Sequence, residues 1–284
     1  MTPADPDQLR ADSREAWERT AAGWGKQADR IRDWGLPVSV TMVDALALQP
    51  GDRVLELAAG PGDTGFMAAE LVAPGGTLIC SDGAEAMLAI ARERAAAAGL
   101  RNVEFRQLEL EWIDLDAASV DAVLCRWGIM LLVDPAAAAL EIRRILRPGR
   151  RAAFAVWDEA DRNPWATIVG RTMVALGHAE PPDPDEPGMF ALAAPGALQE
   201  LLHGAGFADV AVRPVTLERR FARPGDYVAE MSEVSMSFAA ALSGLDDRAR
   251  AEVTERISAQ LEEYLDDEDQ VVLPGSSLVA VATA

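Results

Sequence analysis

Short apolar runs alternate with helix-forming segments along the first half of the chain. The apolar runs lie at residues 54–57, 77–81, 103–108, 120–125 and 151–157. Uninterrupted apolar runs of this length are typical of parallel strands that are covered on both faces. Strands that alternate with helices at this spacing predict a doubly wound α/β sheet, whose ligands bind beyond the carboxyl ends of the strands.

The stretches before and after this region are more helical. Residues 12–31 and 36–48 predict two helices ahead of the first strand, with a frayed start over residues 1–10. Beyond residue 157, helix-rich insertions interrupt the alternation of strands and helices. We expect these insertions to cap the ligand edge of the sheet and to exclude water from it. Two later strands, at 210–217 and 277–283, complete a predicted seven-stranded, mostly parallel, Rossmann-like sheet.

The predicted organisation has six segments. They are an N-terminal helical segment (1–35), a Rossmann-like core (36–157), a cap insertion (158–193), a continuation of the core (194–217), a helical cap (218–272) and a closing strand (273–284). Within the caps, residues 224–242 predict one helix, and the Pro-rich residues 181–188 predict a rigid, exposed loop. Asn163 is predicted to cap a helix over residues 165–176.

One turn between a strand and a helix stands out. The apolar strand at residues 54–57 is followed by small residues up to Gly62, and then by a helix over residues 66–72. This arrangement lets backbone N–H groups and a helix N-terminus approach a ligand closely, as in the binding of dinucleotides and of S-adenosylmethionine (SAM). The dinucleotide pattern G-x-G-x-x-G is absent, and the carboxylates of Glu56 and Asp63 favour a ligand with a cationic portion. A tight turn without a ligand stays open as the alternative.

The composition limits the classes of molecule that this chain is expected to bind. The chain of 284 residues is half apolar and has a formal charge of −20, which argues against binding of nucleic acid or of an anionic membrane. Cys80 and Cys125 lie in apolar runs, so we interpret them as core residues of a cytoplasmic protein. We find no secretory signal, no apolar run of membrane-spanning length and no cluster with metal-ligand spacing, so we expect no catalytic metal. We expect a small-molecule substrate, and a homodimer stays open.

Five short motifs occur together in the strand-rich region. They are residues 56–62, Ser81-Asp82, Leu108-Glu109, residues 121–126 and residues 146–149. In this order and spacing they resemble the class I SAM-dependent methyltransferases, especially the small-molecule group that includes the quinone-biosynthesis enzymes. The resemblance implies a Rossmann-like methyltransferase fold, SAM as the cofactor and methyl transfer to a small molecule. It is loose before residue 36 and beyond residue 157, where such enzymes choose their substrates.

The resemblance also implies roles for individual residues. Asp82 would accept hydrogen bonds from both ribose hydroxyls, and Glu109 would accept one from the adenine amine. The methionine portion would contact Glu56, Ala58, Gly60 and Gly62, the adenine would contact Gly83, Met87 and Leu108, and Cys125 and Arg126 would border the methyl group. Ala58 replaces the first glycine of the family turn, a departure that we expect a strand end to tolerate.

Catalytic and acceptor-binding residues are less defined. A sulfonium methyl is already activated, so holding the acceptor in line at about 3–3.5 Å can supply much of the catalysis. The candidate catalytic residues are His178, Tyr227 and Arg126, of which His178 and Tyr227 could act as a base if one is needed. Surface exposure is the alternative for His178, and a structural ion pair is the alternative for Arg126. The candidates to bind an aromatic or apolar acceptor are Trp17, Trp24, Arg126, Trp127 and Trp165, with core packing as the alternative for the tryptophans.

The sequence therefore favours a SAM-dependent methyltransferase that acts on a small, aromatic or apolar metabolite. The methylated atom (carbon, nitrogen or oxygen) and a place in secondary metabolism stay open. One alternative is a nucleotide-dependent oxidoreductase, which would bind NAD(P). The other is a non-catalytic binding module that keeps the fold, which would bind the cofactor without transferring a methyl group.

Overall fold

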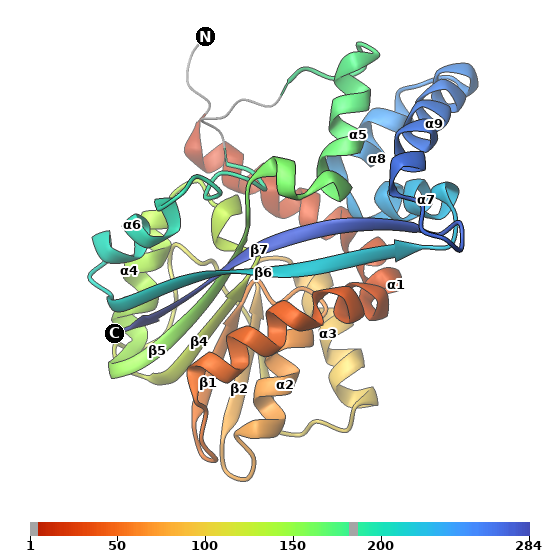
Figure 1. Ribbon diagram of the computed structural model, residues 1–284. Coiled ribbons are helices and arrows are strands. Elements are labelled where there is room, and N and C mark those ends of the chain that lie inside the picture. Colours follow the sequence, from red (N-terminus) through yellow and green to blue (C-terminus); the bar gives the residue numbers. More distant parts are fainter. Residues whose placement is uncertain (1–4, 182–186) are drawn as a thin grey trace.

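Seven strands form one mixed sheet in the part of the chain that the computed structural model describes, residues 5–181 and 187–284 (Figure 1). The strands are β1 (Arg53–Leu57), β2 (Thr77–Asp82), β3 (Val103–Gln107), β4 (Val120–Arg126), β5 (Leu146–Trp157), β6 (Ala208–Phe221) and β7 (Val271–Thr283). Their order is β3-β2-β1-β4-β5-β7-β6. The first five are parallel, and β7 runs antiparallel to both of its neighbours. The predicted α/β fold is confirmed.

Helices cover both faces of this sheet. They are α1 (Pro6–Leu46), α2 (Asp63–Leu71), α3 (Glu85–Ala97), α4 (Pro135–Ile145), α5 (Pro164–Ala175), α6 (Ala197–Gly204), α7 (Pro224–Val234), α8 (Met236–Ser243) and α9 (Asp247–Leu261). The first three form one layer, and α4 and α6 form the other (Figure 1). The remaining four gather at one end of β6 and β7, and α1 packs against α7 and α8 there. Among the described residues, no helix is both long enough and apolar enough to cross a membrane.

The predicted pair of N-terminal helices is wrong, because α1 is one helix of 41 residues that includes Pro37. Proline inside a helix costs roughly 3 kcal/mol. Ile31, Val38 and Met42 nevertheless share one buried stripe across that point, and each buried side chain contributes about 1.5–3 kcal/mol. Tertiary packing therefore outweighs the local break. The expected fraying is also absent from residues 6–10, since Asp5 caps the helix by accepting a hydrogen bond from the Asp7 N–H.

Two predictions within the caps also need correction. The expected helix over 224–242 divides at Ser235, whose hydroxyl caps α8 by accepting a hydrogen bond from the Phe238 N–H. Asn163 does not cap α5 with its side chain. Its amide is instead fully buried, where it accepts from the Trp165 indole N–H and the Ser276 N–H, and so joins α5 to β7. Residues 182–186 of the expected Pro-rich loop lie outside the described residues.

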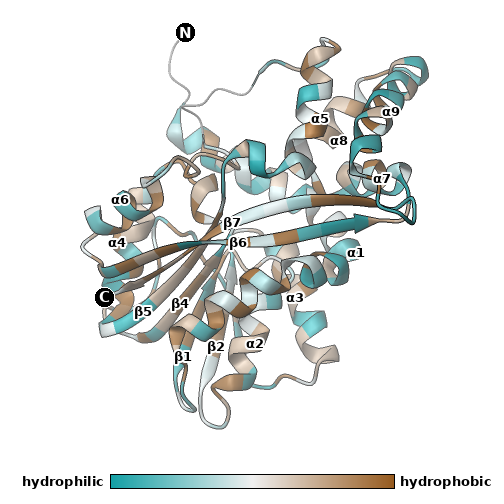
Figure 2. Cartoon of the chain, viewed as in Figure 1, coloured by the Kyte–Doolittle hydropathy of each residue, from teal (hydrophilic) through white to brown (hydrophobic). Residues whose placement is uncertain are grey.

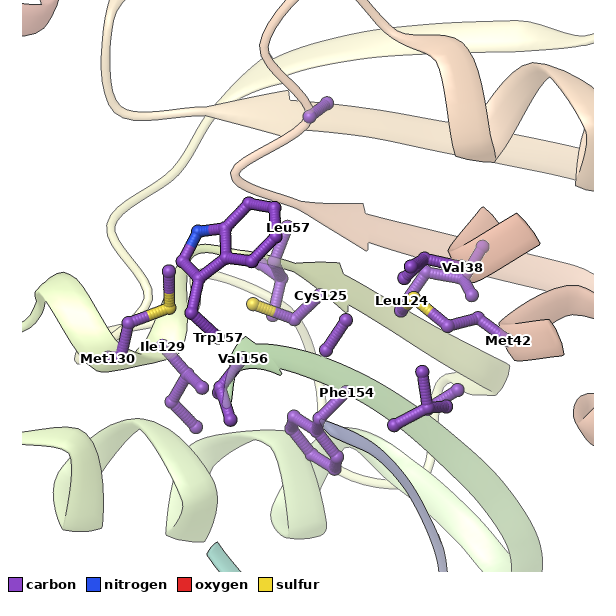
Figure 3. Packing of buried hydrophobic residues seen from close by; sticks show 14 of the residues in the cluster. Val38, Met42, Leu57, Leu124, Cys125, Ile129, Met130, Phe154, Val156 and Trp157 are labelled. Atoms are coloured by element: carbon purple, nitrogen blue, oxygen red, sulfur yellow. The ribbon is translucent and has the colours of Figure 1, made fainter. Parts of the chain in front are cut away.

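The core lies between the central strands and the helices on either face. The apolar colouring in Figure 2 follows the strands, while the outward faces of the helices are polar. Figure 3 shows Val38 and Met42 of α1 beside Leu124 of β4, and Phe154 of β5 nearby. These side chains are fully buried or nearly so. This packing holds the carboxyl ends of β1 and β4 in place, where the chain leaves the sheet.

Candidate active site

The turn after β1 has an unusual backbone. Ala58, Gly60 and Gly62 all have a positive φ, of 50°, 53° and 89°. Glycine adopts such angles without strain, but alanine does not. No atom lies within 4 Å of the position where a Cβ on Gly60 would be, so the turn leaves space there. The strand end therefore accommodates Ala58 only at a conformational cost. The methyl group of Ala58 faces Gly128, which has no side chain to clash with it.

Asp82, the last residue of β2, is fixed beside this turn. One carboxylate oxygen accepts a hydrogen bond from the Gly60 N–H at 2.8 Å, and the other accepts from the Ala84 N–H at 2.9 Å. Burial raises the pKa of Asp82 to about 6, against the opposing effect of these two backbone hydrogen bonds. A carboxylate can accept about four hydrogen bonds, so Asp82 keeps acceptor capacity for the hydroxyl groups of a ligand.

Glu56 lies inside β1 and reaches the same space. Its Oε1 accepts a hydrogen bond from the Gly65 N–H at 2.8 Å, whereas its buried Oε2 has no hydrogen-bond partner among the described residues. Burial raises the pKa of Glu56 to about 8, although the Arg126 charge acts in the opposite direction. A buried carboxylate oxygen without a partner is costly, so this group is suited to a cationic ligand.

A cleft opens over the turn. Eleven of the residues predicted for the site line it: Trp17, Trp24, Glu56, Ala58, Gly60, Asp82, Gly83, Met87, Glu109, Arg126 and Trp127. The predicted residues that do not line it are Gly62, Leu108, Cys125, Trp165, His178 and Tyr227. Gly62 still shapes the turn, since its N–H donates to the Ala59 carbonyl and it precedes the first residue of α2.

Arg126 and Trp127 form the wall of the cleft at the end of β4. The Arg126 guanidinium donates to the Ser39 hydroxyl at 3.1 Å and lies 3.6 Å from a carboxylate oxygen of Asp63. It also stacks 4.6 Å from the centre of the Trp127 ring. Trp127 has a φ of 58°, a strained angle for a bulky residue, of a kind that is found at functional sites. The structure thus shows the ion pair considered for Arg126, and shows it at the cleft.

Tyr227 and Trp165 do not line the cleft. The Tyr227 side chain is completely buried, and its hydroxyl donates to the Trp165 carbonyl at 2.7 Å. Burial raises the pKa of Tyr227 above its ordinary value, which makes the phenol a poor base. Trp165 packs against Trp34 and Trp157 under the cap. The predicted roles of these two residues in catalysis and acceptor binding are therefore not supported. The sequence could not show this, because an aromatic residue on a helix face has the same sequence signature in a core as in a cavity.

Several residues of the cleft were not predicted. They are Arg10, Ser13, Arg14, Ala59, Pro61, Ala84, Leu110, Glu111, Gly128, Leu131, Leu132 and Val133. The first three lie on the same face of α1 as Trp17, at a spacing of three and four residues, and this spacing was the available signal. Among the described residues, no group of three or more His, Cys, Asp or Glu side chains could hold a metal ion.

Comparisons with known proteins identify a methyltransferase domain in this chain. The family of methyltransferase domains matches residues 48–176. Nocamycin O-methyltransferase of Saccharothrix syringae is 30% identical over 193 residues, which cover 65% of this chain and 69% of that protein. Demethylmenaquinone methyltransferase of Clavibacter sepedonicus is 37% identical over 112 residues, 39% of this chain and 44% of that protein. The chain spans about half the length of most of these curated relatives.

Solved structures share the fold at low identity. The YcgJ protein from Bacillus subtilis has a TM-score of 0.56 at 16% identity, with 86% of this chain and 97% of that chain covered. The [4+2]-cyclase SpnF has a TM-score of 0.53 at 19% identity, with 87% and 79% covered. Fold and site together define a Rossmann-like methyltransferase. The chain belongs to the class I SAM-dependent methyltransferases, and the cofactor of this family is SAM.

Proposed function

We propose that this protein transfers the methyl group of SAM to a small, apolar or aromatic metabolite. The observation that carries the proposal is a single cleft in which a carboxylate-flanked, left-handed turn adjoins an apolar wall. The unpartnered oxygen of Glu56 fits the cationic amino-acid portion of the cofactor. Asp82 would accept hydrogen bonds from its ribose, and Glu109 would accept one from its adenine. When bound, SAM supplies an activated methyl group on a positively charged sulfur.

The apolar wall supports the proposed class of acceptor. It is formed by Trp17, Trp24, Trp127, Leu131, Leu132 and Val133. Aromatic walls hold a flat or apolar molecule and also suit the neighbouring positive charge of the sulfonium. The relatives named as nocamycin and demethylmenaquinone methyltransferases favour the same class of acceptor, and the first of them favours a role in secondary metabolism.

The cleft favours catalysis by orientation. The lining residues, all of them in the described part of the chain, include no His, Tyr, Lys or Cys that could act as a base. Of the lining acids, Glu56, Asp82 and Glu109 are assigned to the cofactor in this proposal, and Glu111 is already occupied by hydrogen bonds from Arg10 and from the Asp134 N–H. We therefore propose that the chain holds the acceptor in line with the methyl group and excludes water, and that the attacking atom arrives without a proton that must be removed.

Calorimetry with S-adenosylhomocysteine, followed by a methyl-transfer assay, tests the proposal. We expect binding at micromolar concentrations and transfer of labelled methyl from SAM to members of a panel of small aromatic and apolar acceptors. If S-adenosylhomocysteine does not bind at high micromolar concentration, the proposed function is refuted. Binding of NAD(P) in its place would support the oxidoreductase, and cofactor binding without transfer to any acceptor would support the non-catalytic module.

A further inference from the structure

The first four turns of α1 form part of the cleft wall. Arg10, Ser13, Arg14 and Trp17 occupy one face of this helix, and all four line the cleft. Their spacing of three and four residues places them above one another along the helix. This face of α1 therefore lies opposite the residues proposed to hold the adenosine half of the cofactor, on β2 and on the loop after β3.

Two ion pairs connect this segment to that loop. The Arg14 guanidinium donates to Glu109 at 2.7 Å, and the Arg10 guanidinium donates to Glu111 at 2.5 Å. Arg10 also stacks over the exposed ring of Trp112. Glu109 lies close to Gly83, with a carboxylate oxygen 3.5 Å from where a Cβ would be. Arg14 thus holds the carboxylate that is proposed to accept from the adenine amine.

A third contact attaches the same segment to α3. The Glu18 carboxylate accepts hydrogen bonds from the Glu85 and Ala86 N–H groups, at 2.7 and 3.0 Å. Ala84, which precedes α3, cannot cap it with a side chain, so α1 supplies the cap from a distance in the sequence. The N–H of Ala84 itself donates to Asp82, so Glu18 steadies the turn that positions the ribose-binding carboxylate.

The attachment of α1 changes along its length. Among residues 6–20, all of them described, none is buried, whereas buried positions recur from Ala21 to Leu46. Beyond residue 20 the helix is docked tightly: the Trp24 indole N–H donates to the Val234 carbonyl, and Gly23 packs directly on the backbone of Glu233 in α7. Residues 6–20 are therefore held by polar contacts and by the half-buried ring of Trp17, which packs beside Ala84 and Met87. Such a segment, with no fully buried side chain, is expected to open locally at low cost.

From these contacts we propose that residues 6–20 are a lid over the adenosine half of the cofactor, latched by Arg10, Arg14 and Glu18. The proposal rests on the proposed function, because it takes the cleft as the cofactor site. SAM enters and S-adenosylhomocysteine leaves when the latch opens. In the closed state Arg14 and Glu18 are positioning residues, which act through Glu109 and through the first turn of α3.

Stopped-flow measurement of S-adenosylhomocysteine dissociation tests the latch, with the fluorescence of Trp17 and Trp24 in the cleft as the signal. We expect the double variant R10A/R14A to release the ligand about five- to tenfold faster, the range that two weak ion pairs give. Sodium chloride at high concentration should accelerate release from the wild type and have little effect on the variant. The matched control is Arg19→Ala, which breaks only the exposed pair with Glu15 on the same helix and should leave the rate unchanged.

Hydrogen exchange on the unmodified protein provides a second test that does not depend on a variant's folding. We expect amides of residues 6–20 to exchange faster than those of residues 26–46 in the free protein, and to slow when S-adenosylhomocysteine binds. Equal protection of both parts of α1, or a dissociation rate in R10A/R14A equal to that of the control, would overturn the lid. A wild type that binds no S-adenosylhomocysteine would instead overturn the proposed function.

Discussion

Buried carboxylates at the two ends of the parallel sheet have pKa shifts of opposite direction. At the amino end of β4, Asp121 is paired with Arg147 at 2.6 Å and Arg150 at 3.0 Å, so its pKa is lowered although burial acts to raise it. At the carboxyl ends of β1 and β2, burial raises the pKa of Glu56 to about 8 and that of Asp82 to about 6. At the amino end, arginine side chains pair with the carboxylate. At the carboxyl ends, the carboxylates keep hydrogen-bond acceptor capacity that a cationic ligand can use.

Left-handed backbone occurs at both ends of the sheet. Near the amino ends of the strands it is found at glycines such as Gly51 and Gly75, but also at Ala47 and Ala118. At the carboxyl ends, Ala58 and Trp127 take such angles, and both line the cleft. The pKa shifts of the carboxylates, and not the backbone angles, therefore distinguish the two ends.

The largest expected effect is at Glu56. Because its pKa is raised from 4.5 to about 8, the folded protein binds more protons than the unfolded chain between these values, and stability falls as pH rises through that window. Glu56→Gln should remove this fall and raise the free energy of unfolding at pH 8 by about 2–4 kcal/mol, while it weakens S-adenosylhomocysteine binding. Urea unfolding at pH 5 and pH 8 measures the stability, and an unchanged pH dependence would contradict the prediction.

The second effect is at Asp82. Asp82→Ala should weaken S-adenosylhomocysteine binding by about 1–3 kcal/mol through lost hydrogen bonds to the carboxylate. Because the pKa of Asp82 is about 6, the wild-type affinity should fall as pH is lowered from 7 to 5, and the variant should lack this fall. Calorimetry across this pH range is the measurement. If the variant binds as the wild type does, the ribose lies elsewhere.

Asp121 provides the matched control at the opposite end. Asp121→Asn should lower the free energy of unfolding by about 1–2 kcal/mol at pH 7, a modest value because both arginine partners are partly exposed. The lowered pKa means that this stability is present above pH 4 and is lost as pH falls further. Binding of S-adenosylhomocysteine should not change. A loss of affinity here would remove the distinction between the two ends.

The smallest effect concerns the strained turn. Ala58→Gly should stabilise the fold by about 1 kcal/mol, because glycine adopts a positive φ without the alanine penalty. Gly128→Ala should destabilise the wild type, since the new Cβ would meet that of Ala58 at 2.5 Å. Thermal unfolding of the two single variants and the double variant should show that Ala58→Gly relieves the cost at Gly128. If the stability changes of the two single variants simply add in the double variant, the side chains at positions 58 and 128 do not compete for the same space.

Local patterns determined the strands, the turn after β1 and the carboxylates at the strand ends. A buried strand has an apolar run of its own, and in a parallel sheet the residues that follow such runs meet at one edge, so Glu56 and Asp82 could be placed together from the sequence alone. For the aromatic residues, the sequence pattern did not predict which of them line the cleft. Trp17 and Trp165 have the same character in the sequence, but one lines the cleft and the other packs in the core.

The amino-acid sequence by itself therefore determined the sheet and the class of cofactor, because both depend on contacts and turns between neighbouring segments. Only the tertiary structure decided that α1 continues through Pro37, that Arg10 and Arg14 reach acids 101 and 95 residues away, and that Tyr227 is buried outside the cleft. The physical reason is that these outcomes depend on burial and on charge pairs formed across the fold, which no local pattern records.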